Sequence, residues 1–328
     1  MITYKLYNNN NNKEWEDFII KSMNGTIFHS QEFLNYHIDR VFENHSLMFY
    51  KKNTLIGLFS ASQNNPNHLF SHPGASFGGL ITNELSLANL LEMINLIEDY
   101  AKKNNFQNIT IVPTPLIYHR KLDESLLYAL LWKNYVIKEQ YYSSVIPLEN
   151  NFETHLALIN RNKARSKNYY NKIVATNKLT IEWSNEFDEF YPVLEKNKRK
   201  YNVRPTHSLE EILKLREIMP EKIKLLLIKK NNTVIGGNMI FIANNNVAII
   251  FYNMIDYNYV ELQIAVIQVI ESIKWAYKNN FKFLDFGVSH EPEQMNPLAP
   301  KMSLIKFKHE FGAIGSLRLV MNKKINEK

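Results

Sequence analysis

The stretch KLLLIKKNNTVIG at residues 224–236 decides the fold, because a close counterpart, SLMFYKKNTLIG, occupies residues 46–57. Each copy reads as an apolar strand, a Lys-Lys-Asn turn and a second strand that begins with Thr and ends near Gly. Asn tolerates the positive φ that tight hairpin turns require. Both copies therefore predict a β-hairpin.

A second pair of similar segments follows the two hairpins. YAKKNNFQNITI at 100–111 matches WAYKNNFKFLDF at 275–286, and each reads as a helix end, an Asn-Asn-Phe junction and a buried strand. In both copies the hairpin and the junction lie at nearly the same separation. Internal similarity at a fixed spacing indicates a repeated structural unit. The chain therefore reads as a tandem of two related α/β units.

Each unit has the same expected order of elements: hairpin, strand, long helix, strand. Apolar residues follow the 3.6-residue period of a half-buried helix over residues 86–103, and the matching helix near 260–278 is more apolar throughout. This order predicts a mixed sheet crossed by a helix. The predicted fold class is α/β (α+β), with two tandem domains, 1–147 and 148–328, each a mixed central sheet flanked by helices.

Shorter patterns place the other elements. Pro147 indicates a break between the two units, and a run of basic residues marks the first helix after it. The expected strands are at 67–71, 109–112, 141–148, 247–252 and 283–286, the expected helices are at 152–175, 186–201 and 208–218, and residues 8–12 are expected to form a surface loop.

The composition is that of a globular protein, with 45% of the 328 residues hydrophobic and 22% charged. Cysteine is absent, which excludes disulfides, thiolate metal sites and a cysteine nucleophile. No apolar run approaches the roughly 18 residues of a membrane span, and the N-terminus lacks a secretory layout, so we expect a cytoplasmic protein. The formal charge of +7 is only weak evidence for an anionic partner, and no DNA partner is expected.

Four further motifs are HPGASFGGL at 72–80, PTPLIYHR at 113–120, LDFGVS at 284–289 and FKHEFG at 307–312. With the tandem units they resemble the double-domain GNAT acyltransferases, and more closely the Fem-type branch and its acyl-CoA-using relatives that modify amino sugars. The resemblance covers essentially the whole chain. It implies that an acyl group moves from acyl-CoA to the amino group of a nucleotide-linked amino sugar in surface polysaccharide or O-antigen biosynthesis.

One feature departs from ordinary GNAT sequences. Those enzymes hold the coenzyme A pyrophosphate with a glycine-containing loop at the start of the long helix, where free amides and the helix dipole favour an anion. Here the two junctions read MIDYNYVEL at 254–262 and LITNELS at 80–86, without that pattern. Two alternatives therefore stay open: an aminoacyl-tRNA-dependent Fem-type enzyme acting on a peptidoglycan precursor, and a non-catalytic RNA- or glycan-binding relative.

Acyl transfer to an amine needs a base, a stabilised oxyanion and aligned substrates, but no covalent nucleophile. The sequence has no Gly-x-Ser-x-Gly, His-Glu-x-x-His, P-loop or Gly-x-Gly-x-x-Gly motif, which favours direct attack without a metal or prosthetic group. Asp285, at the end of an apolar strand, and His290, in the following loop, are the candidate bases. Asp285 can equally accept backbone hydrogen bonds in its loop. Tyr252 is the candidate acid for the leaving thiolate, or a core residue.

Candidate substrate-binding residues lie in both units. The Fem-type likeness places the lysine that matches Lys308 near the substrates. Arg165 lies on the basic helix, where guanidinium groups could hold a nucleotide diphosphate or simply face solvent, and Arg204 is a loop arginine. The first unit offers a loop of small residues that backbone can use to approach a ligand, and the candidates there are His72, Ser76, Phe77 and Tyr118.

Overall fold

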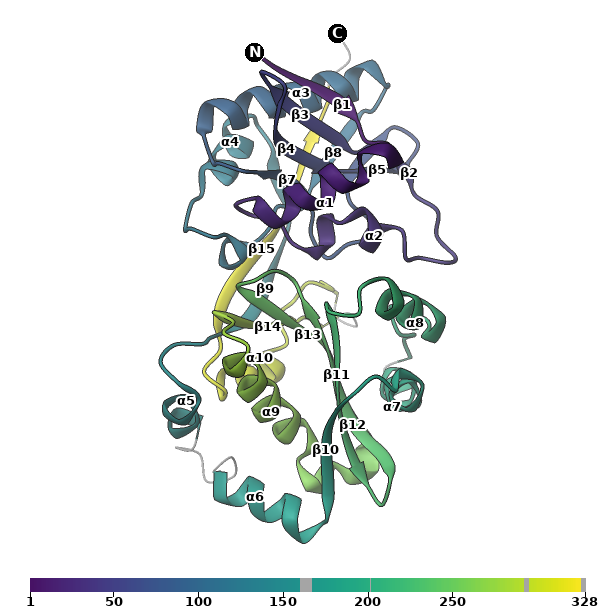
Figure 1. Ribbon diagram of the computed structural model, residues 1–328, viewed down its shortest axis with the longest axis vertical. Helices are drawn as coiled ribbons and strands as arrows, with labels where there is room; N and C mark the ends of the chain where they lie inside the picture. The colour runs from purple at the N-terminus through teal and green to yellow at the C-terminus, as the bar shows by residue number, and fades with distance from the viewer. Residues whose placement is uncertain (160–166, 201, 292–294, 326–328) are drawn as a thin grey trace. The chain divides into compact units, whose positions relative to one another are not determined.

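The computed structural model describes residues 1–159, 167–200, 202–291 and 295–325. The chain divides into two compact units, both mixed α/β as predicted (Figure 1). The first consists of Met1–Tyr142, His290–Ala299 and Ser316–Lys328, and the second of Ser143–Ser289 and Pro300–Gly315. These compact units do not test where the two repeated units meet along the sequence, so the predicted domain boundary at residue 147 stays a prediction.

The first unit has a four-stranded antiparallel sheet of order β1-β3-β4-β7 and a further ladder of order β2-β5-β6-β8-β15, in which β6 and β8 are parallel. Buried apolar residues of helix α3 pack in its core. Its elements are β1 (Ile2–Leu6), α1 (Asn12–Lys21), α2 (Gln31–Leu34), β2 (Glu43–Asn44), β3 (Leu47–Lys51), β4 (Thr54–Ser60), β5 (Ser62–Asn65), β6 (His68–Ser71), β7 (Gly79–Thr82), α3 (Leu87–Lys103), β8 (Asn108–Ile111), α4 (Ser125–Trp132), the start of β9 (Val136–Pro147) and the end of β15 (Ile314–Lys324).

The second unit has a sheet of order β10-β11-β12-β13-β14-β9, antiparallel except for the parallel pair β13 and β14. Helix α9 contacts β12 and β13 on one face, and α7 contacts them on the other, with α8 beside α7 (Figure 1). Its elements are α5 (Phe152–Ile159), α6 (Lys167–Thr176), β10 (Leu179–Ser184), α7 (Phe187–Arg199), α8 (Leu209–Ile218), β11 (Ile223–Lys230), β12 (Thr233–Ile242), β13 (Val247–Ile255), η5 (Tyr257–Leu262), α9 (Ile264–Lys278), β14 (Phe283–Val288) and α10 (Met302–His309).

The two predicted hairpins are confirmed, and they match residue by residue. The turn residues Lys52 and Asn53 have φ of 48° and 63°, and Asn231 and Asn232 have φ of 49° and 64°. Such paired positive φ values are those of a tight turn that fits the twist of its strands. Each hairpin also has a register shift at the same distance from its turn, between Phe49 and Tyr50 and between Ile228 and Lys229.

The glycine that follows each turn lets the crossing helix approach the sheet. A Cβ on Gly57 would lie 2.7 Å from the Sδ of Met93 on α3, and a Cβ on Gly236 would lie 2.5 Å from the Oε1 of Gln268 on α9. Both distances are too short for non-bonded heavy atoms. The Thr-x-Ile-Gly similarity in the sequence therefore reflects one packing requirement that both units share.

Helices α3 and α9 also end in the same way. Asn105 and Asn280 adopt φ of 60° and 57°, and the amide of the following Phe donates to an Ala carbonyl five residues earlier, at 2.9 and 3.1 Å. A residue with positive φ after the helix, together with this backbone bond, is a Schellman termination. The Asn-Asn-Phe junctions thus have the structural role that their repetition predicted.

The units differ in the strand that precedes the crossing helix. In the second unit β13 is one strand with an extra residue, Phe251, where its pairing with β12 shifts register. In the first unit β6 and β7 together pair with β5 and β4, and residues 72–78 form a loop between them. Residues 72–78, the first seven of the HPGASFGGL motif, therefore stand at the position where the second unit has a single bulged residue.

Three local expectations need correction or cannot be judged. Asn9–Asn11 form a 3-10 turn and α1 begins at Asn12, because short polar side chains cap helices well, so residues 8–12 are not a simple loop. The helix expected from 260 begins at Ile264, because Gln263 has a left-handed φ of 51°. The helix expected over 152–175 lies partly outside the described residues. No helix in the described ranges is long and apolar enough to cross a membrane.

Candidate active site of the second unit

The parallel strands β13 and β14 separate after a short region of pairing. Among the described residues they pair only from Val247 with Phe283 to Ile249 with Asp285. Beyond that point β14 pairs with β9 on its other side. Residues 250–255 of β13 therefore present a backbone edge that β14 does not cover, and an extended ligand can hydrogen-bond to such an edge.

Asp285 lies where the two strands separate, and it is buried. Its Oδ1 accepts hydrogen bonds from the hydroxyl of Ser143 at 2.8 Å and from the amide of Gly287 at 2.6 Å. Gly287 has φ of 68°, which suits glycine, and a Cβ there would meet no atom within 4 Å. The carboxylate thus holds the turn that ends β14, as the second reading of Asp285 proposed.

Lys308, on α10, reaches the same strand end. Its ammonium donates to the carbonyls of Phe286, Gly287 and Val288 at 3.0, 2.9 and 3.3 Å, and the side chain is only 7% exposed. Burial lowers its pKa to about 8, and the charge of Asp285 opposes that shift. The structure therefore shows Lys308 bound to three protein carbonyls, and substrate binding by this lysine stays a prediction.

Tyr252 belongs to the uncovered part of β13 and pairs with a histidine that the sequence did not indicate. Its phenol lies 2.9 Å from Nδ1 of His207, and both side chains are 2% exposed. Burial raises the pKa of Tyr252 to about 12, so the phenol is protonated at neutral pH. Lys198 lies over the Tyr252 ring at 5.8 Å, and burial lowers the pKa of that lysine.

A cavity of about 660 Å³ opens beside this pair, at the junction of α7 and α8. His207 lines it, so one histidine contacts both the cavity and Tyr252. Arg204, a predicted substrate-binding residue, lines it as well. Arg199 contributes a second guanidinium, in an ion pair with Glu195 at 3.0 Å. The full lining is Tyr191, Glu195, Arg199, Asn202, Val203, Arg204, Pro205, His207 and Ser208.

The start of α9 offers little space for a diphosphate. Leu262 and Ile264 are buried there, and η5 occupies the preceding junction. Asp256 at that junction accepts a bond from the amide of Asn258 and forms an ion pair with Lys196 at 2.8 Å. A carboxylate at this place opposes an anionic ligand, which agrees with the missing glycine pattern.

The remaining predicted residues lie in the first unit or outside the described chain. Phe77 and Tyr118 are buried and their rings are 4.8 Å apart, so they form part of an aromatic core. Ser76 is half-buried in the loop 72–78. Arg165 lies outside the described residues.

The two candidate histidines of the first unit both contact aromatic rings. His72 is 4% exposed, burial lowers its pKa to about 3, and its Nδ1 accepts a bond from the amide of Gly74. His290 packs edge to face on Tyr141. A role in catalysis or binding for these residues stays a prediction.

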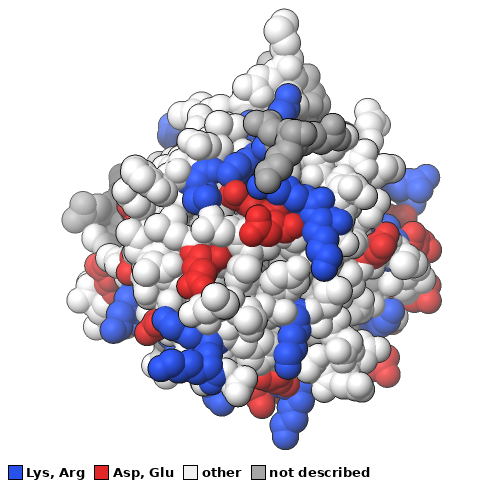
Figure 2. Space-filling view, turned by 90° about the horizontal axis from the view of Figure 1, so that it is seen from above, with Lys and Arg blue, Asp and Glu red and all other residues white. Residues whose placement is uncertain are grey.

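Two further kinds of site would be a basic surface field and a metal site. On the face that Figure 2 shows, basic and acidic side chains are interleaved and do not form a single basic field. No group of three or more His, Asp or Glu side chains in the described ranges could hold a metal ion.

No protein-family model and no curated protein matches the sequence. The fold, in contrast, is similar to solved structures over nearly the whole chain. The crystal structure of FemX matches with a TM-score of 0.75 at 11% identity, covering 99% of this chain and 98% of that one. The chain has a tandem GNAT-like fold.

Two other solved structures of similar fold come from proteins with different described functions. One is the C-terminal domain of a putative lysylphosphatidylglycerol synthetase from Agrobacterium fabrum, with a TM-score of 0.62, 10% identity and coverage of 97% and 92%. The other is a tandem GNAT protein from the clavulanic acid biosynthesis pathway, with a TM-score of 0.54, 6% identity and coverage of 100% for both chains. At these identities the likeness shows the fold alone.

His207 and Lys198 are the site residues that the sequence analysis missed. His207 lies in the Pro-Thr-His-Ser sequence that leads into α8, where Ser208 caps the helix. A histidine next to an N-cap is usually explained by the cap, so the sequence gives no reason to single it out. Its partner Tyr252 is 45 residues away in the chain, and only the folded sheet brings the two together.

Proposed function

We propose that the protein is an acyltransferase that moves an acyl group from an activated donor to an amine by direct attack. The observation that supports this most is the uncovered edge of β13 beside a protonated tyrosine and its histidine partner, within a tandem GNAT-like fold. An acyl donor lying along this edge would bring its carbonyl carbon to the end of the paired region. The cavity at the α7–α8 junction would hold the acceptor.

In the proposed reaction the amine nitrogen forms a bond to the carbonyl carbon as the bond to the leaving sulfur or oxygen breaks. Tyr252, which its raised pKa keeps protonated at neutral pH, gives its proton to the leaving atom. His207 takes the proton that the amine releases and returns it to Tyr252 through their shared hydrogen bond. Asp285 and Lys308 hold the end of β14 in place.

For the substrates we propose acyl-CoA and a nucleotide-linked amino sugar, with the enzyme working in the cytoplasm on a surface polysaccharide precursor. Arg199 and Arg204 in the cavity lining support an acceptor that carries phosphate, because guanidinium groups pair well with phosphate oxygens. The sequence resemblance to acyl-CoA-using relatives supports the donor.

A second candidate, aminoacyl-tRNA as the donor and a peptidoglycan precursor as the acceptor, is favoured by one observation. The start of α9 is filled by buried apolar side chains and carries Asp256, so a coenzyme A diphosphate would not find the usual anion site there. A donor that does not depend on this helix start would avoid the conflict.

The two candidates are separated by supplying each donor in turn. Release of free thiol from acyl-CoA in the presence of nucleotide-linked amino sugars would support the first, and transfer from charged tRNA to a cell-wall precursor would support the second. If neither donor reacts and the protein binds RNA or glycan, it is a non-catalytic relative, and the proposal fails.

Tyr252→Phe tests the assignment of the proton donor. We expect a loss of roughly 100-fold or more in kcat, with a loss of only about 1 kcal/mol in unfolding free energy because one hydrogen bond is removed. Tyr277→Phe is the matched control, since its phenol bonds to the carbonyl of Glu149 elsewhere in the same unit. Equal turnover by both variants would remove Tyr252 from the mechanism.

A further inference from the structure

The second unit contains a buried polar cluster between α9 and the sheet. Gln268 is completely buried, and its Nε2 lies 2.8 Å from the carbonyl of Gly237, 2.8 Å from Oδ1 of Asn238 and 2.7 Å from Oδ1 of Asn253. Asn238 donates in turn to the hydroxyl of Ser272 at 2.9 Å. The cluster therefore joins β12, β13 and α9 through side-chain amides.

The first unit shows that this fold does not require the cluster. Asn238 and Asn253 are cross-strand partners, and the pair at the same positions in the first unit is Phe59 and Leu80. Met93 and Gln268 lie the same number of residues before the matching ends of their helices, so they correspond to each other. The glycines confirm this match independently, because Gly57 lies against Met93 and Gly236 lies against Gln268.

The fourth pair follows from the same count: Ile97 takes the place of Ser272. All four first-unit residues are buried and apolar. Buried amides gain little net free energy over well-packed apolar groups and are costly when a bond is missing. A role other than folding is therefore the simpler reason for four polar residues here.

The cluster fixes the amide of Asn253 at the edge where the donor would lie. Asn253 belongs to the part of β13 that β14 leaves uncovered, and it is half-buried, unlike its three partners. Because its Oδ1 accepts from Gln268, its Nδ2 points away from the cluster. Among the described residues Nδ2 has no hydrogen-bond partner, so both of its protons are available to a ligand.

We propose that the Asn253 amide binds the carbonyl oxygen of the acyl donor and stabilises the oxyanion that forms when the amine attacks. This deepens the proposed function and rests on it. Negative charge develops on that oxygen as the new C–N bond forms, and the charge returns to the leaving group when the bond to sulfur or oxygen breaks. Asn253 is the catalytic residue in this account, and Gln268, Asn238 and Ser272 are positioning residues.

The test replaces the cluster by residues of the first unit. Asn253→Leu should lower kcat about 100- to 1,000-fold, the usual cost of one lost oxyanion donor, with KM changed less than about threefold. Asn253→Asp keeps the shape but puts negative charge beside the oxyanion, so it should be at least as slow. Gln268→Met keeps Asn253 but frees its rotation, so its loss of kcat should be smaller than that of Asn253→Leu.

Thermal stability supplies the readout that is independent of turnover. Asn253→Leu should keep Tm within about 3 °C of the parent protein, because Nε2 of Gln268 keeps the carbonyl of Gly237 and Oδ1 of Asn238 as acceptors for its two protons. A fall in Tm well beyond this would show that the cluster is structural and would overturn the inference. A stable Asn253→Leu variant with parental kcat would overturn it too, while the proposed function stood. A parent protein inactive with every donor would refute the proposed function itself.

Discussion

The two units share a hairpin, a register shift and a helix termination at matching positions, yet they differ in what lies between the crossing helix and the sheet. The first unit has Met93 there and the second has Gln268. Because the backbone is so alike, each unit is a control for the other. What they share is needed for folding, and what only one of them has calls for a separate explanation.

The two units also differ in the strand that precedes the crossing helix. In the second unit it remains one strand, with Tyr252 and Asn253 on its uncovered part. In the first unit the seven-residue loop 72–78 divides it. A divided strand cannot offer a continuous edge to an extended ligand, so the comparison favours the second unit as the place where the donor binds.

The largest effect should come from moving the polar residue to the wrong unit. Met93→Gln would bury an amide among Phe59, Leu80 and other apolar side chains, at a cost of about 3 kcal/mol of unfolding free energy. The opposite change in the second unit, Asn253→Leu, leaves Nε2 of Gln268 with the carbonyl of Gly237 and Oδ1 of Asn238, and should cost less than about 1 kcal/mol. Denaturant unfolding of both variants measures the difference, and similar costs would mean that the second interior depends on its polar residues for folding as strongly as the first depends on its apolar ones.

The second prediction uses His29, a completely buried histidine of the first unit. Burial is the main cause that lowers the pKa of His29 to about 4, against hydrogen bonds to the carbonyls of Gly78 and Thr26. The unfolded chain takes up this proton near pH 6.5 and the folded chain only near pH 4. The contribution of neutral His29 to the free energy of unfolding is therefore complete above pH 6.5, and it is lost as the pH falls towards 4.

His29→Gln isolates this effect. Between pH 7 and pH 4.5 the parent protein should lose about 2 to 3 kcal/mol more than the variant. His72, whose pKa is also lowered, and Glu16, whose pKa burial raises to about 7, titrate in both proteins and cancel in the difference. A parallel pH dependence of the two proteins would show that His29 is protonated in the folded state.

The third prediction tests whether the matching helix ends are equivalent in energy. Asn105→Ala and Asn280→Ala each place a Cβ-bearing residue without a polar side chain at positive φ, so each should cost about 1 kcal/mol. Asn→Gly at either position should be neutral or slightly stabilising. Unequal costs at the two ends, measured by denaturant unfolding, would weaken the comparison of the units.

The sequence predicted the features that depend on neighbouring residues. Asn at both turns and the Asn-Asn-Phe junctions set local backbone angles, and these could be read directly. The Asn238–Asn253 pair could not be predicted from the sequence, because it depends on a strand register that a one-residue bulge shifts. Lys308 was singled out by resemblance, but the three carbonyls that it binds are exposed only by the turn at Gly287.

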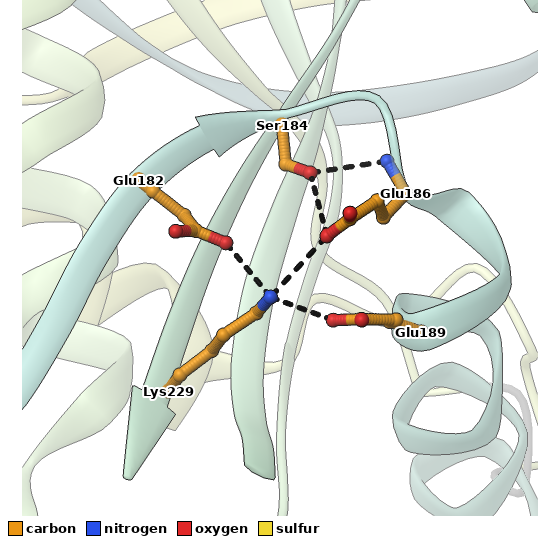
Figure 3. A network of polar contacts seen from close by, with 5 residues as sticks. All are labelled: Glu182, Ser184, Glu186, Glu189 and Lys229. Carbon is orange, nitrogen blue, oxygen red and sulfur yellow. Dashed lines mark hydrogen bonds and ion pairs between the residues drawn. The ribbon is translucent and has the colours of Figure 1, made fainter. Parts of the chain in front are cut away.

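The smallest effect concerns the position directly after the register shift in each hairpin. Lys229 in the second unit contacts Glu182, Glu186 and Glu189 at 2.8, 3.3 and 2.7 Å, with Ser184 beside them (Figure 3). These contacts raise the pKa of Lys229. The matching residue of the first unit, Tyr50, donates its phenol proton to Glu14 at 2.9 Å. Both hairpins are thus tied to an acidic side chain at the same point.

Lys229→Met should cost only about 0.5 to 1 kcal/mol, because the three carboxylates are well exposed and water screens their attraction. Removing the lysine also leaves three negative charges close together, so the cost should fall as salt is added. Tyr50→Phe should cost about as much but with little dependence on salt, since a single exposed hydrogen bond is lost. Denaturant unfolding at low and high ionic strength distinguishes the two, and a salt-independent cost for Lys229→Met would mean that its aliphatic chain, rather than its charge, holds the hairpin.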